Sequence, residues 1–138
     1  SKNNKYYGLK HDVMKISDIH TLSFFIQIDW NIYFGFTIKE YDKRKDIAQN
    51  EKFTELSNSI LNMNQFKGNI KNTEIDRKWW ICWKFPEKEL NFNSFNSKNI
   101  FDLVDKNKRK EIISDIVKEI VDVITTFNQS QEKQNASL

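Results

Sequence analysis

Residues that commonly build reactive sites are scarce in this sequence, which contains one cysteine, Cys82, and two histidines, His11 and His20. One cysteine cannot form a disulfide within the chain, which favours a reducing, cytoplasmic location. Structural zinc sites use closely spaced cysteine and histidine pairs, whereas the two histidines are nine residues apart and would face opposite ways on one strand. We therefore expect no metal site and no cofactor. An inert Cys82 is expected within the apolar segment Trp80-Ile81-Cys82-Trp83.

Glycine and long apolar runs are also rare. The three glycines, Gly8, Gly35 and Gly68, are too scattered for a phosphate-binding loop, and no G-x-S-x-G sequence marks a serine nucleophile. No hydrophobic run approaches the ~20 residues that span a bilayer, and no signal peptide is visible. The sequence therefore predicts no nucleotide-binding loop and no membrane partner.

What the chain does contain is enough apolar material for one core. Its 138 residues are 38% hydrophobic and 14% aromatic, which is typical of a single folded domain. We expect that domain to span residues 1–127 and the polar, aperiodic residues 128–138 to form a flexible tail. The start at Ser1 and this tail suggest a piece of a longer protein.

Alternating apolar residues predict a β-hairpin. Residues 22–28 and 32–38 each place large apolar side chains on one face, and the turn-forming Asp29-Trp30-Asn31 lies between them. An earlier strand is expected within residues 6–19, and another at 79–85, where Trp79, Ile81 and Trp83 would face the core. Pro86 should end that strand or place it at an edge.

Two helices are predicted by apolar residues at spacings of three and four. One covers about residues 46–65, and the other runs from Asp105 or Lys106 to Phe127, with Asp105 as its N-cap. The apolar stripe of the second helix is expected to contain Ile113, Ile116, Val117, Ile120, Ile124 and Phe127. The chain is thus predicted to be an α+β domain of order β-β-β-α-β-α, with two helices packed on one face of a mainly antiparallel sheet.

Nucleic-acid contact would depend on local charge, because the net charge is only +3, from 22 Lys and Arg against 19 Asp and Glu. Nearby aromatics such as Tyr41 suit stacking on unpaired bases. A run of charge is more often simply solvated. The candidate nucleic-acid-binding residues are Lys43, Arg44, Lys45, Arg77, Lys78, Lys108, Arg109 and Lys110.

The sheet face opposite the helices offers a second candidate surface. Phe25, Tyr33 and Trp80 would share that face and form an exposed aromatic interface if no helix covers it.

Three segments carry a resemblance to a known family: FFIQIDWNIYFGF, RKWWICWKFPE and FDLVDKNKRKEIISDIVKEIVDVI. Together they resemble the C-terminal part of bacterial PD-(D/E)XK nuclease-superfamily proteins, over about residues 6–127. The catalytic residues of that family have no match here: two positions before Lys39 stands Thr37 instead of an acidic residue, although Asp29 closes the preceding strand. The resemblance implies an accessory part of a nuclease, without its active site, and a setting in restriction or phage defence.

Two hypotheses follow. The first is a non-catalytic accessory domain that positions, senses or dimerises a neighbouring nuclease, with the rest of the parent protein or a second copy as its partner. The alternative is a nucleic-acid-binding module that uses the basic clusters.

Overall fold

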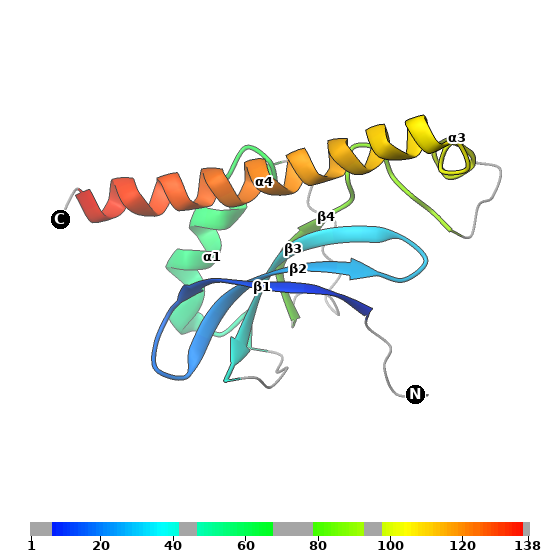
Figure 1. Ribbon diagram of the computed structural model, residues 1–138. Coiled ribbons are helices and arrows are strands. Elements are labelled where there is room, and N and C mark those ends of the chain that lie inside the picture. Colours follow the sequence, from blue (N-terminus) through cyan, green and yellow to red (C-terminus); the bar gives the residue numbers. More distant parts are fainter. Residues whose placement is uncertain (1–6, 42–46, 68–78, 93–97, 137–138) are drawn as a thin grey trace, which may run out of the picture.

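The computed structural model describes residues 7–41, 47–67, 79–92 and 98–136. Its four strands pair antiparallel in the order β1-β2-β3-β4. They are β1 (Tyr7–Lys15), β2 (His20–Ile28), β3 (Ile32–Glu40) and β4 (Trp80–Lys84). The helices are η1 (Glu51–Phe53), α1 (Thr54–Leu61), α3 (Lys98–Asp102) and α4 (Lys106–Ala136). Helices α1 and α4 lie on the same face of the sheet (Figure 1), so the predicted α+β class is confirmed.

The central hairpin forms as predicted. Strands β2 and β3 pair in unbroken register from His20 opposite Glu40 to Ile28 opposite Ile32. The turn is closed by Asp29, whose carboxylate accepts from the backbone N–H of Asn31 at 3.0 Å. The alternation of side chains therefore directs one apolar face of the hairpin toward the helices.

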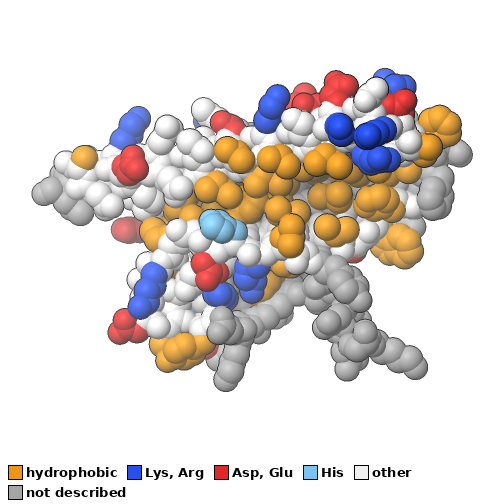
Figure 2. Space-filling model, in the orientation of Figure 1, with side chains coloured by type: hydrophobic (Ala, Val, Ile, Leu, Met, Phe, Trp, Pro, Cys, Tyr) orange, Lys and Arg blue, Asp and Glu red, His pale blue; other side chains and the backbone are white. Residues whose placement is uncertain are grey.

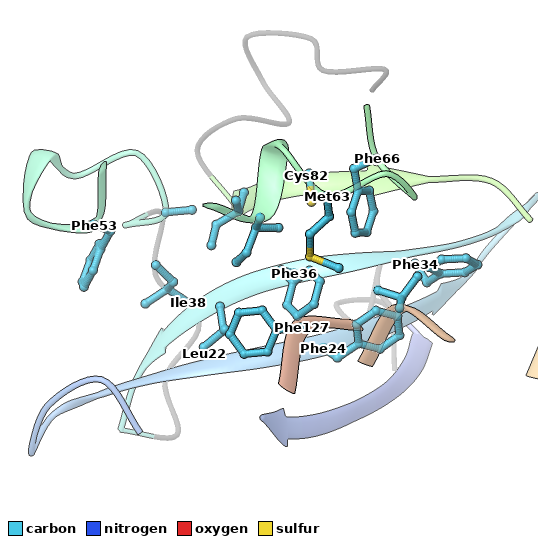
Figure 3. Packing of buried hydrophobic residues seen from close by; sticks show 14 residues of the cluster. Leu22, Phe24, Phe34, Phe36, Ile38, Phe53, Met63, Phe66, Cys82 and Phe127 are labelled. Carbon is cyan, nitrogen blue, oxygen red and sulfur yellow. The ribbon is translucent and has the colours of Figure 1, made fainter. Parts of the chain in front are cut away.

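The main core fills the space between this face and the helices. Phe36 of β3 is central, with ring centroids 5.3 Å from Phe24, 5.9 Å from Phe66 and 5.4 Å from Phe127. Figure 3 shows these rings gathered around Met63. Three segments far apart in the sequence are thus held together by aromatic contacts.

Strand β4 corrects the predicted side-chain directions. A β-bulge is present because Phe36 pairs with Cys82 while Thr37 pairs with Trp80, so Ile81 is the extra residue. Cys82 therefore joins the main core. Trp79 and Trp83, predicted to face the helices, lie with Trp80 on the opposite face of the sheet.

The helices differ from prediction mainly in their ends. The expected helix at 46–65 is reduced to η1 and α1, in a segment rich in serine and asparagine, which have low helix propensity. Helix α3 was not predicted. Helix α4 continues to Ala136, well past the predicted end at Phe127. Its predicted N-cap is confirmed, because the Asp105 carboxylate accepts from the backbone N–H groups of Asn107 and Lys108 at 2.9 and 3.0 Å.

Candidate interaction surface

The groups most able to support catalysis are engaged in structure. Cys82 is buried, and burial raises the pKa of its thiol, which keeps it protonated. His20 is also buried; its ring is 3.1 Å from the hydroxyl of Ser17 and packs edge-on against Phe53. Both histidines lie on the helix-facing side of the sheet, on neighbouring strands, so the prediction of opposite faces was wrong. Among the described residues, no cluster of His, Cys, Asp or Glu is arranged to hold a metal ion.

Asp29 is likewise committed to the hairpin turn. Besides the bond to Asn31, its carboxylate accepts from the Tyr33 hydroxyl at 2.9 Å and from the Gln27 amide at 3.4 Å. A carboxylate with these partners stabilises the turn, and we see in it no arrangement for general acid–base chemistry.

The predicted aromatic residues do come together, but not as an exposed patch. The ring centroids of Phe25 and Tyr33 lie 5.7 and 5.9 Å from that of Trp80, and the ring centroids of Trp83 and Tyr33 are 5.2 Å apart. Trp80 is only 3% exposed and Phe25 is buried as well. The expectation of an exposed interface at Phe25 and Trp80 was therefore wrong, and Tyr33 is partly buried.

Of the predicted basic residues, Lys108, Arg109 and Lys110 are described, and all three are exposed on the first turns of α4. Lys108 Nζ lies 3.5 Å from Asp102, and Arg109 donates to the carbonyl of Leu103 at 3.1 Å. These contacts fasten the junction between α3 and α4. Lys43, Arg44, Lys45, Arg77 and Lys78 lie outside the described residues.

One side of α4 is occupied by polar contacts with the segments nearest β4. Lys88 Nζ is 2.8 Å from Asp115, and Lys84 Nζ is 3.6 Å from Glu119. Asp122 accepts from the amide of Gln65 at 2.8 Å. Lys88, Asp115, Glu119 and Asp122 also line a shallow hollow of about 680 Å³, together with Glu87 and Lys118. We interpret this side as structural.

The other side of α4 is apolar and open. Ile113, Val117 and Val121 are 52%, 50% and 56% exposed. Residues four apart are about 40° apart around a helix, so the three form one stripe. We call the surface formed by Ile113, Val117, Val121 and the partly buried Ile124 the α4 flank. Of the predicted buried stripe, Ile116 and Phe127 are buried, whereas Ile113 and Val117 are exposed; Ile112 and Val123 are buried and were not predicted.

The position of the flank relative to the sheet follows from three successive residues. Ile116 is buried, Asp115 pairs with Lys88 beyond β4, and Val117 is exposed. Because successive residues are about 100° apart, Val117 and Asp115 lie on opposite sides of Ile116. The α4 flank therefore faces toward β1, the edge strand farthest from β4. Figure 2 shows hydrophobic side chains in a band along α4 and over the sheet beneath it.

The sheet extends this apolar surface. Leu9 of β1 pairs with Ile26, a neighbour of the main core, and so shares the helix-facing side, where it is 68% exposed. Ile28 of β2 lies on the same side and is also exposed. Leu9 and Ile28 thus form an open floor on the helix-facing side of the sheet, toward which the α4 flank is turned.

A sequence signal for the α4 flank does exist. The apolar residues of α4 occur as neighbouring pairs, Ile112-Ile113, Ile116-Val117, Ile120-Val121 and Val123-Ile124. Since neighbours are about 100° apart, such pairs indicate an apolar arc wider than one buried stripe needs. No comparable sequence pattern indicates that Leu9 is exposed.

Comparisons of the chain with protein-family models, curated protein sequences and solved structures found no match. Among the described residues, no helix has the length and apolar character needed to cross a membrane.

Proposed function

We propose that this chain is a non-catalytic accessory domain that contacts another protein chain through the α4 flank. The observation that carries the proposal is the stripe Ile113, Val117 and Val121, exposed on a helix whose opposite side is occupied by ion pairs. Contiguous exposed apolar surface bordered by polar residues is typical of protein–protein interfaces.

The absence of catalysis is supported by the state of the reactive side chains. Cys82 is buried, His20 is buried against Phe53, and Asp29 is bonded within its turn. A catalytic group needs access to substrate and a partner that activates it. The three groups that we considered for such roles lack that access or are committed elsewhere.

The setting is part of the same proposal. The resemblance of the hairpin, the tryptophan-rich strand and the last helix to the C-terminal part of PD-(D/E)XK proteins supports a role beside a nuclease, with phage defence as the biological context. The single buried cysteine supports a cytoplasmic location.

Photo-crosslinking tests the contact surface. A photoreactive amino acid would replace Val117 in one variant and Gln129 in a control, in the protein expressed in the cells that make it. Gln129 is exposed on the same helix but lies about 120° around it from Val117. We expect a protein adduct from position 117 at several times the yield from position 129. Equal yields, or no adduct from position 117, would contradict the proposal.

A cleavage assay tests the absence of catalysis. The purified chain would be incubated with DNA or RNA and Mg²⁺ or Mn²⁺, and we expect no products above a buffer control. Cleavage that disappears in Asp29→Asn would overturn the proposal.

The nucleic-acid alternative has one supporting observation, the exposed Lys108, Arg109 and Lys110. It predicts binding to single-stranded DNA that weakens steeply with salt, because bound phosphates release counterions. Replacing all three with glutamine should abolish that dependence. Binding that salt does not weaken would discard this alternative.

A further inference from the structure

We propose that the α4 flank is covered by the α4 flank of a second copy of this chain, with the two helices antiparallel about a two-fold axis. The inference rests on the proposed function and names its partner. A two-fold interface uses the same surface on both copies, so a flank that serves it must complement itself.

Pairing through the helix is favoured over pairing through the edge of the sheet. Strand β1 pairs only with β2 among the described strands. It also carries Lys10 and Lys15 and a β-bulge between Asp12 and Met14. Lysines and bulges are the usual means by which edge strands avoid pairing with another chain. The α4 flank has no charged residue among Ile113, Val117, Val121 and Ile124.

The charges at the two ends of the flank complement each other in an antiparallel pair. Lys106 and Lys110 lie at its N-terminal end, within the arc that contains the apolar residues, and Glu132 lies at its C-terminal end, about 20° outside that arc; all three are exposed. Placing Val117 opposite Val121 of the second copy centres the pair on Glu119, and it also places Lys106 opposite Glu132, because each is 13 residues from that centre. A parallel pair would instead bring lysine against lysine.

The size of the surface indicates a weak, reversible dimer. The flank from Lys106 to Glu132 is about 39 Å long and a helix is about 10 Å wide, which gives a projected area on the order of 400 Å². Leu9 and Ile28 enlarge it. A stable complex buries about 800 Å² per partner and weaker ones bury less. We therefore expect a dissociation constant in the micromolar range.

Sedimentation equilibrium tests the dimer. Between about 1 and 300 µM, the average mass of the chain should rise from 16.6 kDa toward twice that value. Val117→Glu places a charge in each half of the interface and should weaken association by about a hundredfold or more. Glutamate is a better helix former than valine, so the fold should remain intact, as circular dichroism would verify. Gln129→Glu adds the same charge outside the flank and should leave the mass unchanged.

Charge exchange tests the antiparallel arrangement. Glu132→Lys should weaken the dimer on the order of tenfold, and adding Lys106→Glu should restore it. Both changes suit the helix dipole, so neither should weaken the fold. Failure of the second change to rescue the first would refute the antiparallel pairing.

The two proposals fail in different ways. A chain that stays monomeric at the highest concentration refutes the second copy as partner. In that case an adduct of another mass at position 117 would still support the proposed function, whereas an adduct at twice the mass of the chain would support both.

Discussion

Ile112 and Ile113 are adjacent in α4 but differ in environment, so the same substitution at each tests which side of the helix is buried. Ile112 is 4% exposed and belongs to a cluster with Leu90, Ile100 and Ile116. Ile→Ala removes three carbon atoms, which costs about 0.8 kcal/mol each in lost burial, and a cavity adds to this. Alanine regains about 0.5 kcal/mol of helix propensity. We expect Ile112→Ala to lower the free energy of unfolding by about 3 kcal/mol.

Ile113→Ala should cost far less. The Ile113 side chain is half exposed, so its removal loses about half of the burial free energy that is lost at Ile112, and it leaves no closed cavity. The gain in helix propensity is the same at both positions. The net loss should be about 0.5–1 kcal/mol. The two variants should therefore differ by about 2 kcal/mol, or about 8 °C in melting temperature for a chain of this size.

Urea unfolding followed by tryptophan fluorescence measures this difference, at protein concentrations low enough to keep the chain monomeric. The four tryptophans give a strong signal. Equal losses, or a larger loss for Ile113→Ala, would refute the orientation of α4 and with it the existence of the exposed flank.

Three further predictions follow from the sheet. Gly35→Ala should destabilise the fold by several kcal/mol in urea unfolding, because an added Cβ would lie 1.9 Å from the Cys82 carbonyl oxygen and the strands would have to move apart; near wild-type stability would contradict the close pairing of β3 and β4. The hydrogen bond from Lys39 lowers the pKa of the Asp12 carboxyl, so its stabilising effect is present above the unfolded pKa and is lost as pH falls through the lower folded pKa. Asp12→Asn should therefore show a smaller loss of stability below about pH 4 than the native chain when urea midpoints are compared, and identical pH profiles would count against this pair. Cys82 should not react with a thiol reagent in the folded chain and should react on unfolding; rapid reaction in the folded chain would contradict its burial.

The hairpin was predictable because local alternation determines it. Residues 22–28 and 32–38 have one apolar face each, and Asp29 supplies a side-chain bond that closes the turn between them. Neither feature depends on distant residues. The α+β class followed from the same kind of local pattern.

The faces of β4 were not predictable from alternation alone. A single extra residue, Ile81, shifts the alternation, so Cys82 and Trp83, which follow it, lie on the faces opposite to those that simple alternation predicts. The bulge depends on pairing with β3. The sequence order Trp79-Trp80-Ile81-Cys82 carries no local sign of that pairing. Trp83 was therefore assigned to the wrong face, and so was Trp79, which precedes the strand and does not follow its alternation.

The candidate site lay in a predicted element but on the wrong side of it. Ile113 and Val117 fit a stripe at spacings of three and four as well as Ile112 and Ile116 do. The choice between the two stripes is made by Lys84, Lys88 and Gln65, which bind the acidic side of α4 and so fix its rotation. Those contacts join segments far apart in the sequence.

The most direct test of the central claim is the access of solvent to the methyl groups of α4, measured by nuclear magnetic resonance with a soluble paramagnetic agent in dilute chain. The methyl groups of Ile113, Val117 and Val121 should relax strongly, while those of Ile112, Ile116 and Val123 should be little affected. Protection of Val117 equal to that of Ile116 in the monomer would contradict the account.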